Sequence, residues 1–435
     1  MRWLSRTAVL WMSLGVVQGI VADDLPWNQF RGPRGDGTSK STNLPVTFAE
    51  GSPEIVWKTP VPGRAWSSPV VWGQQIWITN APEIQNLAEG QKQLEQPLKL
   101  SAVCLDLQTG KVLHDLVLFE VIKPQFTHAT NSYGSPTPNL EEGRAYVHFG
   151  AYGTACLELP SGKVLWKRDD LPCDHFRGPG SSPIVYGDLL YLTMDGFDFQ
   201  YIAALNKHTG KTVWRQDRNV DFGTTDGDAK KGYSTPILIE AGGKEMLISP
   251  FASATIAYEP KTGARMWMVR HGGMNAAARP LYGNGLVYIN SADGPNPLVT
   301  VNPDGVGDLT EKIVWRTNKS VPKRSSQLLI GDSLFMMNDG GVASCLNALT
   351  GEVLWTKRLP GEYWSSPLCA NGMIYCCSQK GEIQVFKASR DFELVAENHL
   401  DDGFNASPAV AGDSLILRSK THVYRIAKPQ ATAGQ

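Results

Sequence analysis

Several features that mark common functional classes are missing from this sequence. Its 41 basic and 42 acidic residues nearly cancel, only 19% of the residues are charged, and there is no long basic run. These properties exclude the electrostatic footprint of a nucleic-acid-binding protein. Beyond the N-terminal region no apolar stretch is long enough to span a membrane. No metal-ligand spacing such as His-x-x-x-His and no Ser-His-Asp arrangement stands out, so we predict neither catalytic residues nor a metal site.

Residues 1–22 have the pattern of an export signal. Arg2 and Arg6 provide positive charge, a short apolar run follows, and Ala22 offers a small residue at a plausible cleavage point. An uncleaved anchor is the alternative. The first cysteine is Cys104, so nothing supports a lipid anchor behind the apolar run. We therefore predict an exported protein, in the periplasm or outside the cell, without a membrane span, and we expect a monomer.

The sequence does contain an internal repeat. Its unit is a small residue, Leu, an Asp, Asn or Glu, and then Thr-Gly or Ser-Gly, with a Trp at the end of most copies. Glycine supplies the positive φ of a tight hairpin, and a large aromatic ring at a fixed place suits stacking between sheets. The copies centre on Thr109-Gly110, Ser161-Gly162, Thr209-Gly210, Thr262-Gly263 and Thr350-Gly351, and a looser copy reaches Trp315.

A second marker, made of small residues before a proline, precedes the copies. Its spacing is mostly in the forties, which is typical of four-stranded propeller blades. Small side chains at this point suit strands that converge on a crowded central axis. The eight markers are Ser67-Ser68-Pro69, Gly134-Ser135-Pro136, Ser181-Ser182-Pro183, Ser234-Thr235-Pro236, Ala278-Arg279-Pro280, Ser325-Ser326-Gln327, Ser365-Ser366-Pro367 and Ala406-Ser407-Pro408.

We therefore predict an all-β fold, an eight-bladed β-propeller of four-stranded antiparallel blades. Residues 54–58 form a Trp-bearing fourth strand without a preceding blade, whereas residues 404–427 supply only three strands. An N-terminal strand should thus complete the last blade, which removes the exposed sheet edges of a linear array. The predicted organisation is a signal peptide (1–22), a lead-in segment (23–53), the propeller (54–427) and a C-terminal tail (428–435).

Three segments depart from the repeat. Residues 80–100 interrupt a hairpin and predict a short helix or a mobile loop, with a lid over one mouth of the propeller as the alternative. Residues 218–232 have an Asp spacing that loosely resembles a calcium loop, but the ligand set is incomplete, so we expect a solvated loop. Ala388 to Val395 lacks both Thr-Gly and Trp, so the packing of the seventh blade must differ.

The repeat unit resembles that of the quinoprotein propellers, the PQQ-like or tryptophan-docking repeat, over residues 54–427. The segment from Trp27 to Gly37 also resembles the lead-in of exported PQQ-like proteins of bacteria, planctomycetes especially. Some members of this family are dehydrogenases that hold pyrroloquinoline quinone (PQQ) and Ca²⁺ on the axis. Others, such as the BamB type of outer-membrane assembly factor, carry no cofactor. Fold alone does not choose between them.

The cysteines do not favour the dehydrogenase branch. The resemblance implies a vicinal Cys-Cys disulfide beside the cofactor in an early blade. Cys376-Cys377 is vicinal, but it lies in the predicted seventh blade, where the sixth has Met336-Met337. Three other cysteines share one repeat position in separate blades, too far apart to bridge, and seven is an odd number. We interpret the cysteines as core residues.

A binding site is expected where loops lead into the Pro-marked strands, because these strands line one mouth of the channel. Basic and aromatic residues prevail there, and Glu362 is the lone acid beside a marker, which suits an anionic or sugar-like ligand better than Ca²⁺. We favour a non-catalytic propeller that binds a protein partner or a cell-envelope ligand, with no cofactor. The alternative is an alcohol or sugar dehydrogenase that uses PQQ and Ca²⁺. The candidate site residues are Arg64, Trp66, His128, Asn131, Tyr133, His175, Arg177, His271, Asn275, Arg279, Arg324, Trp364 and Asn405.

Overall fold

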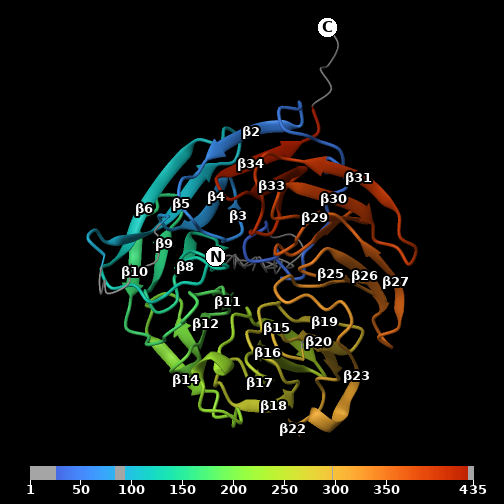
Figure 1. Cartoon of the computed structure of the whole chain (residues 1–435). Helices are drawn as coiled ribbons and strands as arrows, with labels where there is room; N and C mark the ends of the chain where they lie inside the picture. Colours follow the sequence, from blue (N-terminus) through green and yellow to red (C-terminus); the bar gives the residue numbers. More distant parts are fainter. Residues whose placement is uncertain (1–25, 84–93, 296, 430–435) are drawn as a thin grey trace, which may run out of the picture.

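Eight antiparallel sheets surround a central axis in the computed structural model, which describes residues 26–83, 94–295 and 297–429 (Figure 1). Within the described residues these sheets are the blades of a propeller, as predicted. The first strand of each blade lies nearest the axis and the last lies at the rim (Figure 1). The predicted signal peptide and most of the predicted C-terminal tail lie outside the described residues.

We number the blades along the chain from the first complete one. Blades 1 to 4 are β3 (Val70–Trp72), β4 (Gln75–Asn80), β5 (Leu98–Asp106) and β6 (Val112–Val121); β7 (Asn139–Glu141), β8 (Arg144–His148), β9 (Thr154–Glu158) and β10 (Val164–Arg168); β11 (Ile184–Tyr186), β12 (Leu189–Asp195), β13 (Gln200–Asn206) and β14 (Thr212–Asp217); and β15 (Ile237–Ala241), β16 (Lys244–Pro250), β17 (Ala254–Tyr258) and β18 (Arg265–Arg270).

Blades 5 to 8 follow the same plan. They are β19 (Leu281–Gly283), β20 (Leu286–Asn290), β21 (Leu298–Val301) and β23 (Ile313–Thr317); β24 (Leu328–Ile330), β25 (Ser333–Met337), β26 (Val342–Asn347) and β27 (Val353–Arg358); β28 (Leu368–Ala370), β29 (Met373–Cys377), β30 (Glu382–Lys387) and β31 (Leu394–His399); and β32 (Ala409–Ala411), β33 (Ser414–Arg418), β34 (His422–Ala427) and β2 (Ile55–Pro60). Blades 4 and 7 each gain a short fifth strand beyond the predicted four, β22 (Gly307–Asp308) and β1 (Thr38–Ser39).

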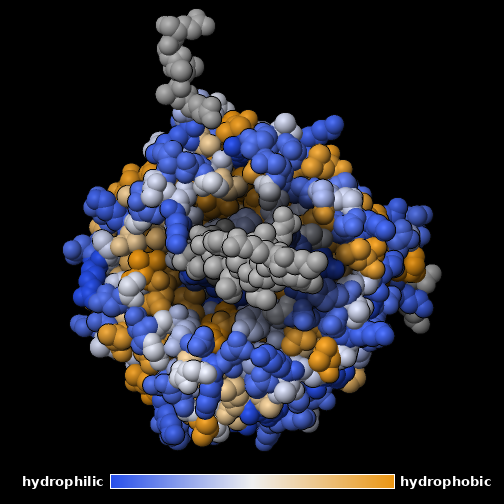
Figure 2. Space-filling model, turned by 180° about the vertical axis from the view of Figure 1, so that it is seen from behind, coloured by the Kyte–Doolittle hydropathy of each residue, from blue (hydrophilic) through white to orange (hydrophobic). Residues whose placement is uncertain are grey.

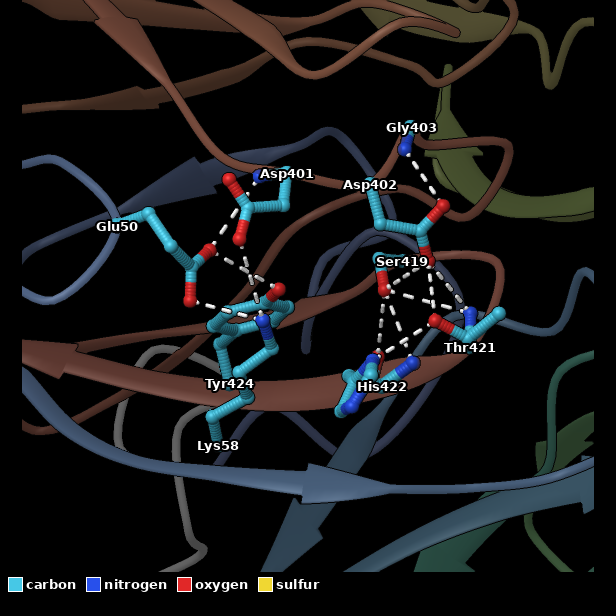
Figure 3. A network of polar contacts seen from close by, with 9 residues as sticks. All are labelled: Glu50, Lys58, Asp401, Asp402, Gly403, Ser419, Thr421, His422 and Tyr424. Carbon is cyan, nitrogen blue, oxygen red and sulfur yellow. Dashed lines mark hydrogen bonds and ion pairs between the residues drawn. The ribbon is translucent and has the colours of Figure 1, made fainter.

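Strand β2 closes the ring, as predicted. It pairs antiparallel with β34, so one N-terminal strand and three C-terminal strands share blade 8. Around this seam Lys58 forms an ion pair with Glu50 at 2.8 Å, and the Glu50 carboxylate also accepts a hydrogen bond from the hydroxyl of Tyr424 (Figure 3). These charged groups are partly exposed, and exposed ion pairs contribute at most about 1 kcal/mol. The seam must therefore depend mainly on strand pairing and apolar packing.

The repeat tryptophans join neighbouring blades. The indole of Trp166 in blade 2 donates a hydrogen bond of 2.9 Å to the carbonyl of Lys207 in blade 3 and lies over Gly210 of the same turn. Gly210 has a φ of 71°, which favours glycine, and a Cβ there would lie 2.6 Å from the indole. Trp57, Trp214 and Trp315 make the corresponding hydrogen bond and glycine contact with the next blade. The Thr-Gly turn is thus the receptor for the neighbouring Trp.

Not every blade has this arrangement, and two of the exceptions use another ring as a substitute. In blade 1 the Trp position is taken by His114, whose ring nitrogen lies 3.1 Å from the carbonyl of Pro160 in blade 2. In blade 7, where the Thr-Gly is missing, Phe392 packs edge-on against Trp355 at 5.1 Å. The predicted difference in packing is therefore a second aromatic ring in the place of the glycine turn.

The other two irregular segments differ in part from expectation. Within residues 80–100, residues 98–100 belong to β5, and residues 84–93 lie outside the described residues, so the lid hypothesis is not tested. Within residues 218–232, only the middle is a solvated loop. A 3₁₀ turn (Gly227–Lys230) follows it, and Lys231 is fully buried. Asp228 attaches the segment to the loop of Arg177 by an ion pair, and it also pairs with Lys231 within the segment.

All seven cysteines are buried free thiols; Cys376 lies in the apolar core between blades 6 and 7, and Cys377 in a core that includes blade 8. This agrees with their interpretation as core residues. No helix among the described residues is long and apolar enough to cross a membrane.

Glycine substitutions separate the two roles of the Thr-Gly turn, which are to adopt a left-handed backbone and to receive the neighbouring Trp. Gly210→Ala should destabilise the protein by about 2–5 kcal/mol, because a left-handed backbone costs about 1–2 kcal/mol for a residue with a Cβ and overpacking adds about 1–3 kcal/mol. The matched control is Gly187→Ala, since Gly187 has a φ of 54° but open space around it. Chemical denaturation should show only the backbone cost for the control. Equal losses for both variants would contradict the docking role of the turn.

The closing strand offers a second test. Trp57→Ala should lower the free energy of unfolding by about 3 kcal/mol, the low end for a Trp truncation, because Trp57 is half-buried. Lys58→Ala should cost at most about 1 kcal/mol. Val56→Ala on the exposed face of the same strand should stay within about 0.5 kcal/mol. If Lys58→Ala lowered the denaturation midpoint more than Trp57→Ala, the seam would depend on charge instead.

Candidate functional site

A girdle of hydrogen bonds surrounds the axis at the Pro markers. The bonds come from the backbone N–H of the residue before the marker proline, or before Gln327 in blade 6. Blade 2 differs from the sequence marker, because there the bonding residue is Thr137, which follows Pro136 and precedes a second proline, Pro138. In seven of the eight steps around the ring this N–H donates to a Ser or Thr hydroxyl at 2.9–3.0 Å. We call these hydroxyls the girdle; they belong to Ser68, Thr137, Ser182, Thr235, Ser326, Ser366 and Ser407. The eighth position is Arg279, which has no hydroxyl.

The lead-in segment closes the channel on one side of the girdle. The carbonyls of Trp27 and Asn28 accept backbone hydrogen bonds from β3 and β7, the innermost strands of blades 1 and 2, and the carbonyl of Gly37 accepts one from β28 in blade 7. Between these contacts Arg31 reaches the carbonyls of Ser326 and Gln327 in blade 6. The segment thus crosses the axis and is fastened to blades on opposite sides of the ring.

Arg279 fills the gap in the girdle and holds this segment. Its guanidinium donates to the carbonyl of Phe30 at 2.5 Å and to the side-chain oxygen of Gln29 at 3.2 Å. Gly35 lies so close to this guanidinium that no side chain would fit there. Among the described residues, Arg279 and Arg31 form hydrogen bonds with carbonyl oxygens only. Burial lowers the pKa of Arg31 to about 10 and that of Arg279 to about 9, so both stay charged at neutral pH.

Above this floor the channel is a cup that opens at one mouth. Its volume is about 210 Å³, and Phe30 of the lead-in and six girdle residues line it. This is smaller than the roughly 300–1,000 Å³ of pockets that take drug-sized ligands, so the cup suits a single ring or a chain end. Hydrophilic residues prevail along the outer edge of the face that Figure 2 shows. The remaining lining residues are Trp66, Thr130, Asn131, Ser135, Arg177, Gly180, Tyr233, Asn275, Ala277, Ala292, Asp293, Lys323, Arg324, Trp364 and Asn405.

The girdle presents hydrogen-bond donors to the cup. Each of its oxygens already accepts a backbone N–H, so the hydroxyl hydrogen remains to be donated. The girdle residues are 1–6% exposed and lie deep in the molecule. Three further polar atoms of the lining are buried without a partner among the described residues. They are Nε1 of Trp66, Nε of Arg177 and Oδ1 of Asn275.

Cations crowd the mouth of the cup. Arg177 pairs with Asp228, Lys323 with Asp293 at 3.0 Å, and Arg324 with Asp339. The guanidinium of Arg324 also lies 4.2 Å from the centre of the Trp364 ring. Among the described lining residues three are cations, Arg177, Lys323 and Arg324, and one is a carboxylate, Asp293, so the cup has a positive surplus.

The pKa of His128 depends on the cations around the mouth. Its ring bonds the hydroxyl of Thr130, a lining residue, at 2.8 Å. Burial lowers the pKa of His128 first, and Arg177, Arg324, Lys231 and Arg64 lower it further. The imidazole is therefore neutral at pH 7, and a bound anion would raise its pKa.

The structure places the thirteen candidate residues in three positions. Those that line the cup are Trp66, Asn131, Arg177, Asn275, Arg324, Trp364 and Asn405. Arg64, whose guanidinium lies 5.5 Å from the ring centre of Trp66, and His128 lie next to lining residues. The remaining four do not line the cup. Tyr133, His175 and His271 are buried and hydrogen-bonded within the blades, and Arg279 lies under the floor.

Sequence inspection missed several lining residues. Phe30 comes from the lead-in, which no marker precedes, and Tyr233 immediately precedes a marker but was not selected. Asp228 and Lys231 reach the mouth from the insertion in blade 3, which had been expected to be solvated. The Ser and Thr residues of the markers were visible in the sequence, but they were interpreted only as small residues near the axis.

The lining does not fit calcium. Ca²⁺ requires six to eight oxygen ligands with several carboxylates among them. The cup has one carboxylate among its described lining residues, Asp293, and that group is hydrogen-bonded to Asn275 and Lys323. No group of three or more His, Cys, Asp or Glu that could hold a metal occurs in the described parts of the chain. The described lining residues therefore do not supply the ligands that a PQQ–Ca²⁺ pair needs.

Comparison with known proteins places the chain in a family. The family model described as "Outer membrane protein assembly factor BamB" matches residues 198–430, just over half of the chain. The protein belongs to this family of PQQ-like β-propellers. Its relatives include both branches expected from the repeat.

Two relatives of this BamB-family propeller illustrate the split. The 1-butanol dehydrogenase (quinone) of Thauera butanivorans is 25% identical over 59% of the chain and 41% of its own length. Outer membrane protein assembly factor BamB of Legionella pneumophila is 21% identical over 54% of the chain and 47% of its own length. The chain thus spans less than half of either relative.

A solved structure supports the fold alone. The quinohemoprotein alcohol dehydrogenase of Comamonas testosteroni superimposes with a TM-score of 0.65 over 95% of the chain and 82% of its own, at 10% identity.

The cationic surplus predicts how His128 titrates. In ¹H NMR its C2 proton should titrate with a pKa below 6.5, and Arg177→Gln or Arg324→Gln should raise that pKa, because each removes a cation that disfavours the imidazolium. His128→Gln assigns the resonance. Arg316→Gln on the exposed face of β23 is the matched control and should leave the pKa unchanged. A pKa at or above 6.5 in the unmodified protein would contradict a positive mouth.

Proposed function

We propose that this BamB-family propeller is an exported, non-catalytic binding protein that holds a partner protein or a cell-envelope ligand at the mouth of its cup. The observation that carries the proposal is the chemistry of the cup. It is closed below by the chain's own lead-in, it presents many hydrogen-bond donors, and cations outnumber carboxylates among its described lining residues. Such a lining suits recognition of an anion and offers no carboxylate base beyond the paired Asp293.

Export rests on the N-terminal pattern of Arg2, Arg6, the short apolar run and Ala22. The printed name of the Legionella relative, an outer membrane assembly factor, is consistent with a role in the cell envelope.

A quinone dehydrogenase is the second candidate. It is favoured by the similarity to the butanol dehydrogenase and by a cup that combines tryptophans with cations, which would suit a carboxylated aromatic cofactor. The missing calcium ligands weigh against it. Asp293 would also have to leave Lys323 and Asn275 to act as a base.

Reconstitution with PQQ and Ca²⁺ separates the two candidates. After gel filtration the purified protein should retain no quinone absorbance, and alcohols or aldoses should not reduce an electron-acceptor dye in its presence. A known quinoprotein dehydrogenase treated in the same way serves as the positive control. Retained quinone together with substrate-dependent dye reduction would overturn the non-catalytic proposal.

A further inference from the structure

We propose that the cup binds an acidic sugar, the carboxylated or sulfated unit at the end of a polysaccharide chain. This inference rests on the proposed binding function and names the ligand class of that site. The ligand's charged group would sit towards the girdle and its ring between the aromatic residues of the mouth.

The need for an anion follows from buried charge. Arg31 and Arg279 lie under the floor, and carbonyl oxygens are their only hydrogen-bond acceptors in the described parts of the chain. The carboxylate of Asp36 acts on both guanidiniums through space, but it forms its hydrogen bonds with Arg34 and Thr38, so two buried cations share one acid. Buried charge is costly, and a further anion placed nearby would offset part of that cost. Arg177 and Arg324 add cations at the side of the cup.

The donors of the cup are arranged for an anion with several oxygens. Six girdle hydroxyls line the cup, each with a hydrogen to donate. The Nε atom of Arg177 is buried without a partner among the described residues. Hydrogen bonds from such groups to an ionised acceptor are roughly twice as strong as neutral ones. A carboxylate or sulfate would use several of them together.

The upper part of the cup suits a sugar ring. Trp66 and Trp364 line it, and each indole is held by a guanidinium, that of Arg64 or Arg324. Rigid aromatic faces pack against the C–H groups of a pyranose at low conformational cost. The amides of Asn275 and Asn405 supply donors and acceptors for sugar hydroxyls. Asn275 is only 6% exposed, and its Oδ1 has no partner among the described residues.

The size of the cup favours a sugar over other anions. A volume of about 210 Å³ exceeds what an inorganic anion fills, so such an ion would leave the tryptophans without a partner. An acidic peptide would have to bury backbone N–H and C=O groups in a closed cup, which is costly where they are not all paired. A single sugar unit fills the space and pairs with both its polar and its apolar walls.

Calorimetric titration tests this proposal. Galacturonate, glucuronate and galactose 6-sulfate should bind at least tenfold more tightly than galactose or glucose. The comparison between uronates and the sulfated sugar identifies the preferred charged group. Affinity for the acidic sugars should fall as NaCl rises from 20 to 500 mM, because salt screens exposed charge, whereas neutral sugars should be insensitive. This salt series needs no variant.

Three variants locate the site. Arg177→Gln should weaken acidic sugars at least tenfold and leave neutral sugars unchanged, because Arg177 lines the cup, whereas Arg316→Gln on the outer strand β23 should change neither. Trp66→Leu should weaken all sugars but not inorganic sulfate. Melting temperatures verify that each variant is folded.

Four outcomes would overturn the acidic-sugar proposal. They are equal affinity for neutral and acidic sugars, affinity for sulfate or acetate alone as high as for the acidic sugars, tighter binding of an acidic peptide, and no binding of any probe. None of these depends on PQQ, so the failure of this inference is distinguishable from retained quinone, which would overturn the proposed function.

Discussion

The girdle of backbone N–H to hydroxyl hydrogen bonds at the axis is the interaction on which the rest of this molecule depends. Eight strands meet there, and only small side chains let them approach closely enough to bond sideways. The same bonds orient the hydroxyl oxygens, because an oxygen that accepts an N–H from one blade must turn its hydrogen elsewhere. One set of residues therefore joins the blades at their inner ends and supplies the donors of the cup.

The single interruption of the girdle is equally consequential. Arg279 replaces a hydroxyl with a long cation, and its guanidinium reaches the lead-in segment and holds Phe30 across the channel. The lead-in segment closes the channel on one side, so that the channel is a cup, and the guanidinium of Arg279 is a buried positive charge under its floor. Burial of such a charge costs free energy, and in an otherwise well-packed ring a cost of this kind is typical of a functional site.

Much of the fold could be predicted from the sequence, because propeller blades repeat. Thr-Gly turns and tryptophans recur at fixed places, which predicted the hairpins and the stacking of a ring between sheets. They did not reveal that Trp166 lies on Gly210 of the next blade. The closing strand β2 was visible as a Trp-bearing strand without a blade. The short fifth strands β1 and β22 were not, since they are only two residues long and no repeat marks them.

The site was less accessible to sequence inspection. The markers correctly indicated which loops meet at one mouth, and seven candidate residues line the cup. Sequence could not distinguish side chains that point into the channel from those buried between blades, such as His175 and His271, because both follow the same marker loops. It also could not show that a separate N-terminal segment returns to form the floor, since that contact joins Phe30 to Arg279 over nearly 250 residues.

Family membership leaves both an enzymatic and a non-enzymatic branch open, and the chemistry of the cup is what favours binding. The most direct test of the central claim is a crystal structure of the protein with bound galacturonate. We predict that its carboxylate lies within hydrogen-bonding distance of girdle hydroxyls and of Arg177 or Arg324, above a floor formed by Phe30. A channel that is open from face to face, or galacturonate bound only outside the cup, would contradict the account.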